Sequence, residues 1–387
     1  MISSASNQPF IAIACGGTGG HLFPGLAVAD QLRQRGCSVT LLVSPKDVDQ
    51  EAVKSARDMA IHTLPAVALQ NRNYFSFAGS FWRSWRAARN IFQAQPPRAV
   101  LAMGGFTSAP PVLAAKKFGA QTFLHESNTI PGRANRLLAR FVDGAFVGFP
   151  EAAGRLRNSS VVVTGTPVRS EFQSRDPGVC RVQLGLDPYR PTILVMGGSQ
   201  GASGLNGMIL SILPLLGGRN WQWLHLTGAG DFERVRAAYA AHGLTAVVKP
   251  FLGEMGLALG AATAAVSRAG ASSLAEIAAL RLPTLLVPYP TAADDHQLFN
   301  ARAFVNTGAA RLLEQKQSTP EKCLASLHDL VENEPVRTGI QAGLARWHAP
   351  QAAAEIAERI VNALARRADV HCPVGSHVAG GCCKVIA

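Results

Sequence analysis

Several features that mark specialised classes of protein are absent from this sequence. Charged residues make up only 16% of its 387 residues and hydrophobic residues 48%, a balance that excludes an intrinsically disordered chain. The seven cysteines are scattered, without a CxxC pair or a zinc-ligand spacing, so we expect reduced thiols. No GxxxxGK(S/T) motif is present, and the glycine-rich segments do not fit a nicotinamide fingerprint. We therefore expect a large globular protein without a P-loop, a zinc site or a disulfide framework.

Segments that would direct the chain across a membrane are also missing. Residues 1–10 carry no Lys or Arg, so the charged start of a secretory signal is absent. A transmembrane helix needs about 20 consecutive apolar residues. The long uncharged stretches 99–115 and 191–218 are interrupted by glycine and proline. We expect a protein that is soluble or bound peripherally to a membrane.

Acidic residues are scarce in the first half of the chain. The net charge is +12, and residues 1–168 carry +9 of it. Between residues 72 and 140 there are ten basic residues and one acidic residue, Glu126. Such a basic region indicates an anionic partner: a nucleic acid, an anionic membrane or a phosphorylated substrate.

Short apolar runs alternate with amphipathic stretches along the chain. Residues 22–35 have apolar positions at helical spacing, and Gly36 supplies the end of that helix. The predicted buried strands are 10–15, 39–43, 99–103, 122–125, 145–147, 161–163, 192–196, 223–227, 246–250, 264–267 and 284–287. Strands that alternate with helices predict parallel sheets covered by helices on both faces.

The second half of the chain begins in the same way as the first. In each half a strand is followed by a glycine-rich turn and a helix, with the turns at 16–20 and 197–201. We therefore predict an α/β protein of two doubly wound domains that face each other across a cleft. The expected N-terminal domain comprises residues 8–168 and a last helix within 350–367, the C-terminal domain comprises 169–349, and the tail 368–387 is expected to be disordered.

The glycine-rich turns are candidate anion sites. A turn between a strand and a helix presents backbone N–H groups at the positive end of the helix dipole. Two such turns at the carboxyl ends of facing sheets favour a phosphorylated ligand over two tight connections. Small and hydroxylated residues at 267–273 also precede a helix and predict another cradle. Glu276 in that helix would either bind a ribose diol or only favour the helix dipole.

Several polar residues fall where they would line the cleft. His21 opens the first helix, where it would act as a base towards a sugar hydroxyl or bond to the backbone. Residues 125–128 follow a predicted strand and would line the cleft or cap a helix. The Asp-Asp-His-Gln run at 294–297 suggests a metal, but successive helical side chains point in different directions. Hydrogen bonding to a sugar through His296, Gln297 and Asn300 is the favoured interpretation.

One segment of the basic region is also aromatic. Residues 72–89 interleave six aromatic residues with four arginines. If exposed, the aromatics would enter the headgroup layer of a membrane while the arginines pair with anionic lipids. In the alternative, an amphipathic helix buries the aromatics in the domain core. The candidate membrane patch consists of Phe75, Phe81, Trp82, Trp85, Arg83 and Arg86.

Taken together, these motifs resemble the MurG family of bacterial N-acetylglucosaminyltransferases. The matching segments are GGTGGHLFPGLAVA (16–29), HESN (125–128), GTPVR (165–169), GGSQGA (197–202), SRAGASSLAE (267–276) and DDHQ-x-x-NA (294–301). Six motifs in the family's order are far more specific than a single glycine-rich loop, and the resemblance extends from about residue 10 to residue 367. The chain departs from the family at Ser127, Thr166 and His296, where Gln, Asn and Gln occur in other members.

The resemblance implies a GT-B fold of two Rossmann-like domains and a defined reaction. N-acetylglucosamine (GlcNAc) would pass with inversion from UDP-GlcNAc to the 4-hydroxyl of the N-acetylmuramic acid (MurNAc) in lipid I, giving lipid II and UDP. His21 would be the candidate base. The residues implied in donor binding are Thr18, Gly19, Asn128, Arg169, Ser199, Leu252, Gly270, Ala271, Ser272, Ser273, Glu276, His296 and Gln297. The residues implied on the acceptor side are Gly17, Thr18, Gly20, His21, Gly104, Gly105 and Glu126.

The resemblance also implies the setting of this reaction. No cofactor and no active-site metal is expected, because helix N-terminal amides and Arg169 can stabilise the departing UDP. The expected partners are UDP-GlcNAc, lipid I, the anionic inner leaflet of the membrane and other cell-wall and division proteins, but no nucleic acid. The expected location is the cytoplasmic side of the cell inner membrane, with peripheral attachment.

Three other functions are consistent with parts of the sequence. A UDP-GlcNAc epimerase, or a glycosyltransferase with a different acceptor, would share the fold, although an epimerase would have little use for the aromatic basic segment. A single-strand nucleic-acid-binding protein would fit the charge but would leave two phosphate cradles unexplained. A non-catalytic scaffold for wall-synthesis enzymes would not need the cleft motifs.

Overall fold

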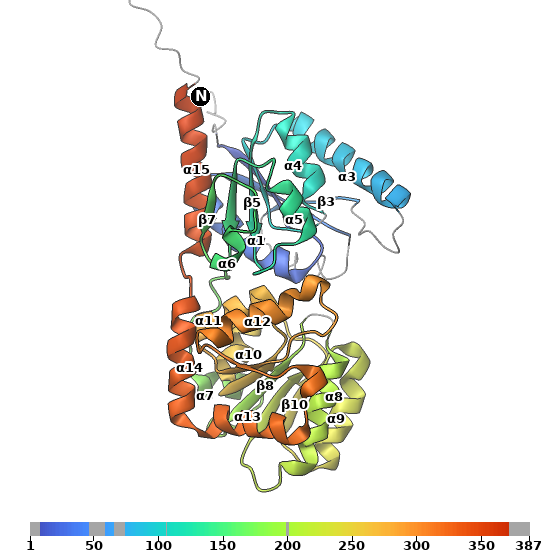
Figure 1. Cartoon of the computed structure of the whole chain (residues 1–387), viewed down its shortest axis with the longest axis vertical. Coiled ribbons are helices and arrows are strands. Elements are labelled where there is room, and N and C mark those ends of the chain that lie inside the picture. The colour runs from blue at the N-terminus through green and yellow to red at the C-terminus, as the bar shows by residue number, and fades with distance from the viewer. Residues whose placement is uncertain (1–7, 46–58, 66–73, 106, 199–200, 371–387) are drawn as a thin grey trace, which may run out of the picture.

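The chain folds into two parallel β-sheets, each covered by helices (Figure 1). The computed structural model describes residues 8–45, 59–65, 74–105, 107–198 and 201–370. Within these ranges every strand pair is parallel. The prediction of an α/β protein with two doubly wound units is therefore confirmed.

The first sheet has seven strands in the order β3-β2-β1-β4-β5-β6-β7. They are β1 (Phe10–Ala14), β2 (Ser38–Val43), β3 (Ala60–Thr63), β4 (Ala99–Ala102), β5 (Gln121–Glu126), β6 (Gly144–Val147) and β7 (Val161–Val163). Its helices are α1 (Gly19–Gln34), α3 (Tyr74–Ala94), α4 (Ala109–Lys116), α5 (Arg133–Leu138) and α6 (Pro150–Ala153). The strand order reverses between β1 and β4, so the turns after these two strands diverge, which is where open α/β sheets bind ligands.

The second sheet has six strands in the order β10-β9-β8-β11-β12-β13. They are β8 (Thr192–Met196), β9 (Gln222–Leu226), β10 (Ala246–Lys249), β11 (Ala264–Ser267), β12 (Thr284–Leu286) and β13 (Arg311–Leu312). The helices that follow the crossing between the sheets are α7 (Pro177–Gln183), α8 (Ser203–Ile212), α9 (Phe232–Ala241), α10 (Met255–Ala261), α11 (Ala271–Leu280), α12 (His296–Asn306), α13 (Pro320–Glu332) and α14 (Glu334–Trp347). Here the order reverses between β8 and β11, and the turns that carry the glycine-rich motifs follow these strands.

Burial explains which strands the apolar pattern predicts. All five residues of β1 and all five of β8 are buried, because a central parallel strand is covered on both faces. The pattern misses β3 and β13. β3 is an edge strand whose residues are mostly exposed, and β13 has only two residues, so neither has an apolar run to detect.

The chain crosses between the two sheets twice, and the two crossings touch. The first follows β7, where Gly165 has a φ of +80°. A Cβ atom on Gly165 would lie 2.3 Å from the Cβ of Ala349, which belongs to the second crossing. The last helix, α15 (Ala352–Val370), then packs against α1 of the first sheet (Figure 1). It ends at Val370, three residues into the segment predicted as a tail, and residues 371–387 lie outside the described residues.

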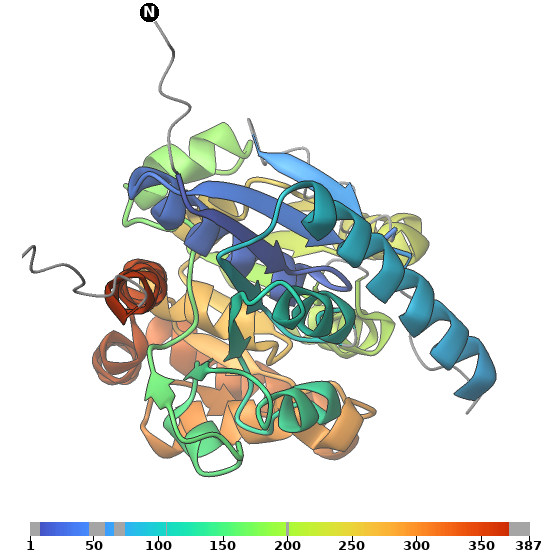
Figure 2. The ribbon, with the colours of Figure 1, turned by 90° about the horizontal axis from the view of Figure 1, so that it is seen from above.

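Helix α3 lies on the opposite side of the first sheet from α15, as both views show (Figures 1 and 2). Its hydrophobic side packs mainly against α4. Among the helices that the structure describes, none combines the length and the apolar character needed to span a bilayer.

We expect the packing of α15 to be required for the stability of the first sheet and its helices. Ile356 is fully buried in the core that α15 shares with α1. Ile356→Ala should lower the free energy of unfolding by about 2–5 kcal/mol, because it removes buried methyl groups and leaves a cavity. Urea unfolding measures the loss, and the exposed Glu358→Ala on the same helix is the control. Equal stability of the two variants would contradict this role.

Candidate active site

The first glycine-rich turn connects β1 to α1. Gly17 has a φ of +111°, a backbone conformation that favours glycine. Thr18 is extended, and its carbonyl accepts hydrogen bonds from the amides of His21 and Leu22 at 3.0 and 3.2 Å. Helix α1 therefore begins with Gly19 and Gly20, and the start of a helix after a glycine-rich turn is the kind of place that binds an anion.

His21 lies between this turn and the glycine pair that follows β4. Its Nδ1 is 3.3 Å from Thr18 Oγ1. A Cβ atom on Gly104 would lie 2.9 Å from His21 Nε2, and one on Gly105 would lie 3.2 Å from its Cε1. Both glycines have positive φ, +116° and +77°. The structure thus brings two residues predicted on the acceptor side against the candidate base, at positions where a side chain would displace the imidazole.

Glu126, also predicted on the acceptor side, organises the loop after β5. Its buried carboxylate accepts four hydrogen bonds of 2.9 to 3.1 Å. The donors are the backbone amides of Asn128 and Gly132 and the side-chain amides of Asn128 and Asn135. Glu126 therefore holds Asn128 in place, an internal role that the motif alone does not reveal.

His125 ties this loop to the crossing between the domains. It is fully buried, and its Nε2 lies 3.1 Å from the carbonyl oxygen of Gly165. Burial lowers the pKa of His125 to about 4, against the smaller opposing effects of the Gly165 hydrogen bond and the Glu126 charge. His125 is therefore neutral near pH 7 and serves the structure of the loop.

Arg169, Glu171 and Glu276 form a charged cluster on the donor side. The Arg169 guanidinium is 2.9 Å from Glu171, and its carbon lies 4.1 Å from the ring centroid of Phe23 in α1. Burial raises the pKa of Glu276 from 4.5 to about 7; Arg169 opposes this rise and Glu171 adds to it. Glu171 is not among the predicted site residues, although its place two residues after the GTPVR motif was an available signal.

The predicted phosphate cradle forms the start of α11. Gly270 is the extended N-cap, followed by Ala271, Ser272 and Ser273 in the first turn. The Ser272 hydroxyl donates a 3.0 Å hydrogen bond to the carbonyl of Gly20. The helix starts of α1 and α11, one from each domain, are therefore in direct contact, and we call this place the domain junction.

The Asp-Asp-His-Gln run forms the turn into α12. The two carboxylate oxygens of Asp294 lie 3.3 and 3.1 Å from the guanidinium groups of Arg133 and Arg136 in α5, across the junction. Asp294 and Asp295 both have left-handed φ, 50° and 51°. Within the described ranges, no three His, Cys, Asp or Glu side chains are grouped so as to hold a metal ion.

His296 and Gln297 have different surroundings. His296 Nδ1 lies 2.7 Å from the carbonyl oxygen of Ala293. The Gln297 side-chain oxygen accepts hydrogen bonds from the amides of Ala269 and Tyr289, at 3.3 and 3.0 Å. Gln297 therefore joins the segment before the α11 cradle to the loop after β12, which leaves its side-chain NH₂ as the group to offer a sugar.

Asn300 joins the two domains through a buried amide. Its oxygen accepts hydrogen bonds from the amide and the hydroxyl of Thr129, both at 2.9 Å. Its nitrogen donates to Asn128 Oδ1 at 3.0 Å and to the carbonyl of Ala269 at 3.2 Å. All four hydrogen-bonding positions of this fully buried side chain are thus used, and Asn128 is aligned with the cradle. The sequence predicted that Asn300 would bond to a sugar and did not predict these hydrogen bonds between the domains.

Two further residues predicted on the donor side are Leu252 and Ser199. Leu252 is buried just after β10, at the same edge of the second sheet as the glycine-rich turns. Ser199 lies outside the described residues. The backbone contact predicted for Leu252 and the diphosphate contact predicted for Ser199 stay predictions.

The candidate membrane patch lies on α3 with its small residues turned inward. Ser80, Ser84, Ala88 and Phe92 are buried, whereas Trp82 is 55% exposed. The partly buried residues of the patch are Phe81 and Trp85, its exposed arginines are Arg83 and Arg86, and the side chain of Phe75 lies outside the described residues. Of the described aromatics of the patch, Trp82 is thus exposed, whereas Phe81 is partly buried and Trp85 packs against the domain core, as the alternative expects.

Cations surround these tryptophans. The guanidinium carbon of Arg86 is 5.4 Å from the ring centroid of Trp82, and that of Arg89 is 5.8 Å from Trp85. Lys117 of the turn after α4 lies 4.9 Å from the Trp85 ring. The patch therefore extends from α3 to α4 as a surface that is both basic and aromatic.

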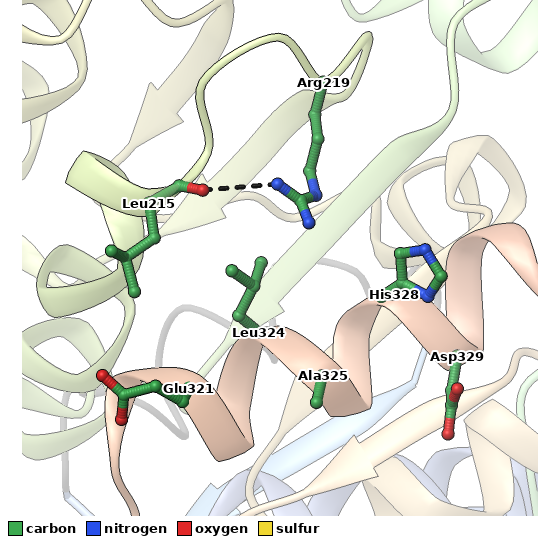
Figure 3. Close-up of a pocket in the computed structure, with 7 residues that line it drawn as sticks. All are labelled: Leu215, Arg219, Glu321, Leu324, Ala325, His328 and Asp329. Carbon is green, nitrogen blue, oxygen red and sulfur yellow. Dashed lines mark hydrogen bonds between the residues drawn. The ribbon is translucent and has the colours of Figure 1, made fainter.

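A separate hollow of about 570 Å³ lies beside α13 of the C-terminal domain (Figure 3). It is lined by Leu215 and Arg219 on one side and by Glu321, Leu324 and His328 of α13 on the other. None of the predicted site residues lines it, so it does not belong to the candidate active site.

Comparison with known proteins assigns the chain to a family. The glycosyltransferase family 28 N-terminal domain matches residues 11–147, and the family 28 C-terminal domain matches residues 192–360. The UDP-N-acetylglucosamine--N-acetylmuramyl-(pentapeptide) pyrophosphoryl-undecaprenol N-acetylglucosamine transferase of Xanthomonas axonopodis pv. citri (strain 306) is 38% identical over 362 residues, which cover 92% of this chain and 83% of the relative. The enzyme of the same name from Chlorobium luteolum is 38% identical over 370 residues, covering 91% and 98%.

Solved structures agree with this assignment. MurG of Acinetobacter baumannii has a TM-score of 0.71 and 27% identity, with 92% of this chain and 99% of that chain covered. A UDP-N-acetylglucosamine 2-epimerase has a TM-score of 0.68 at 14% identity, covering 93% and 98%. At that identity the epimerase shares the fold alone.

The raised pKa of Glu276 makes the stability of the protein depend on pH. Between about pH 4.5 and pH 7 the folded protein keeps a proton on Glu276 that the unfolded chain releases, so stability decreases as pH rises through this window. Glu276→Gln removes the carboxylate and should raise the Tm relative to the parent at about pH 8, and by less at about pH 5. Thermal unfolding at the two pH values measures this, with the exposed Glu358→Gln as control. A Tm difference that is the same at both pH values would contradict the assigned environment.

Proposed function

This chain belongs to glycosyltransferase family 28, with the MurG N-acetylglucosaminyltransferases, and we propose that the domain junction is where it carries out their reaction. The enzyme transfers GlcNAc from UDP-GlcNAc to lipid I, the undecaprenyl-diphospho-MurNAc-pentapeptide, and so forms lipid II and UDP. The observation that carries the proposal is the contact of Ser272 with Gly20. It sets the donor cradle of one domain against the glycine-rich turn and candidate base of the other.

The donor binds to the C-terminal domain. Its diphosphate lies at the N-terminus of α11, where the amides of residues 270–273 and the Arg169 guanidinium face negative charge. Glu276 in the same helix accepts hydrogen bonds from the ribose hydroxyls, and the backbone at Leu252 binds the uracil. Ser199 and Gly19 complete the contacts to the diphosphate and sugar.

The transferred sugar lies between the two domains. Asn128, His296 and Gln297 surround the GlcNAc of a donor whose diphosphate lies in the cradle. Asn300 holds Asn128 in place through its hydrogen bonds. These side chains recognise the hydroxyls and the acetamide of GlcNAc. Asn128 comes from the N-terminal domain and the other two side chains from the C-terminal domain, so recognition of the sugar needs both domains in contact.

His21 acts as the base that activates the acceptor. The start of α1 disfavours a positive charge on the imidazole, so a neutral ring accepts the proton of the MurNAc 4-hydroxyl. The hydroxyl oxygen attacks the anomeric carbon of GlcNAc from the face opposite UDP, and the electron pair of the broken bond passes to the diphosphate. The amides of α11 and Arg169 stabilise that charge without a metal ion or cofactor.

The acceptor approaches along the N-terminal domain. Gly17, Thr18 and Gly20 form one wall and Gly104 with Gly105 the other, while Glu126 maintains the adjoining loop. The lipid tail of lipid I stays in the membrane, and the α3–α4 surface binds the anionic cytoplasmic leaflet of the inner membrane beside it. Peripheral attachment there would also bring the enzyme near other cell-wall and division proteins.

A turnover assay with radiolabelled UDP-GlcNAc, with and without a lipid I analogue, tests the reaction. We expect label in a lipid product and release of UDP only when the acceptor is present. His21→Gln should reduce this transfer roughly a hundredfold while UDP-GlcNAc still binds, because the base is lost and the donor cradle is intact. Consumption of UDP-GlcNAc without acceptor would instead indicate an epimerase or hydrolase on this fold.

Vesicle binding tests the membrane surface. Trp82→Ser removes an exposed aromatic and should weaken binding to phosphatidylglycerol-containing vesicles roughly tenfold, with an unchanged fold. Tyr189→Ser, which removes a 92% exposed aromatic from the C-terminal domain, is the matched control. Co-sedimentation measures both, and equal binding of the two variants would count against this surface.

A further inference from the structure

Arg268 is a buried cation whose partners are all neutral. Its side chain is only 6% exposed, and its hydrogen bonds run to the carbonyls of Val287 and Pro288, at 3.0 and 3.1 Å, and to the Gln315 side-chain oxygen at 2.8 Å. Its guanidinium carbon lies 5.6 Å from the ring centroid of Tyr289. Within the described part of the chain, its Nε has no hydrogen-bond partner. Burial lowers the pKa of Arg268, with Tyr289 acting in the opposite direction.

A buried charge without a counter-ion is costly to the fold. Arginine cannot relieve this cost by losing its proton near pH 7, because its pKa is far too high. The donor-side carboxylates do not compensate it: Glu171 pairs with Arg169, Asp294 pairs with the arginines of α5, and the charges that act on Glu276 are those of Arg169 and Glu171. An anionic ligand is the partner that would complete the charge balance around Arg268.

The position of Arg268 indicates which anion this is. It follows β11 and comes two residues before Gly270, the N-cap of α11. Its partner Gln315 packs on Gly204 in the first turn of α8, where a Cβ atom would lie 2.5 Å from the Gln315 side-chain nitrogen. The guanidinium therefore lies between the starts of α8 and α11, the two helices that follow the glycine-containing turns of this domain.

We propose that Arg268 supplies the positive charge that holds the diphosphate of the nucleotide-sugar donor and stabilises it as UDP departs. This deepens the proposed function and rests on it. Both terminal nitrogens of Arg268 already donate hydrogen bonds to protein groups, so it acts through its charge and through the segment 268–270 that it anchors. It is a positioning residue, in contrast to Arg169, which we place in contact with the donor.

Binding of uridine and UDP to Arg268→Gln separates this role from a structural one. We expect the affinity for UDP to fall about tenfold, the effect of removing one nearby charge from a partly shielded site, with uridine affinity unchanged. Isothermal titration measures both ligands. Equal losses for uridine and UDP, or no loss for UDP, would overturn the proposal.

Arg268→Lys carries the test if the Gln variant does not fold. Lysine keeps the charge without the planar fork. Retention of the preference for UDP over uridine would support the charge-based role, and its loss would overturn it. Failure of the parent protein to bind UDP would instead refute the proposed function itself.

Arg181→Gln is the matched control. Arg181 also binds two carbonyls and one side-chain oxygen, those of Ala261, Pro188 and Thr263, at 2.9, 2.8 and 3.1 Å. These partners precede β8 and β11, at the edge of the sheet away from the cradle. The substitution should lower stability and leave the ratio of UDP to uridine affinity unchanged. An equal change of this ratio in both variants would also overturn the proposal.

Discussion

The site between the two domains depends on the buried amide of Asn300. A side-chain amide has four hydrogen-bonding positions, and this one shares them between Asn128 and Thr129 of one domain and Ala269 of the other. Since an unsatisfied buried polar group costs free energy, the amide strongly favours this one relative placement of the domains. The contact of Ser272 with Gly20 and the ion pairs of Asp294 follow from that placement.

Charge is distributed unequally around this junction. On the donor side one arginine, Arg169, is shared with Glu171 and opposes the raised pKa of Glu276, while Arg268 has neutral partners. Carboxylates accept hydrogen bonds from hydroxyl groups and arginines bind phosphates, as the proposed nucleotide-diphosphate donor requires.

The basic surface of the N-terminal domain has a different physical basis. Small residues such as Ser84 and Ala88 let α3 pack closely on the domain, and Trp82 on the same helix is left exposed. Cations next to Trp82 and Trp85 give that surface a positive charge. A surface that is both basic and aromatic is what the proposed binding to an anionic lipid headgroup layer requires.

Local sequence was sufficient for the architecture and for the place of each motif. Central strands such as β1 and β8 are continuous apolar runs, and the glycine-rich turns follow them because only small residues allow such close passage of the backbone. The edge strand β3 has no such run and was missed. The motifs likewise placed residues 270–273 at the start of a helix and Glu276 within it, from their neighbours in the chain. The partners of Glu126, Asn300 and Arg268 could not be read in this way, because hydrogen bonds and burial join residues that are far apart in sequence. Their roles became visible when tertiary packing brought both domains together.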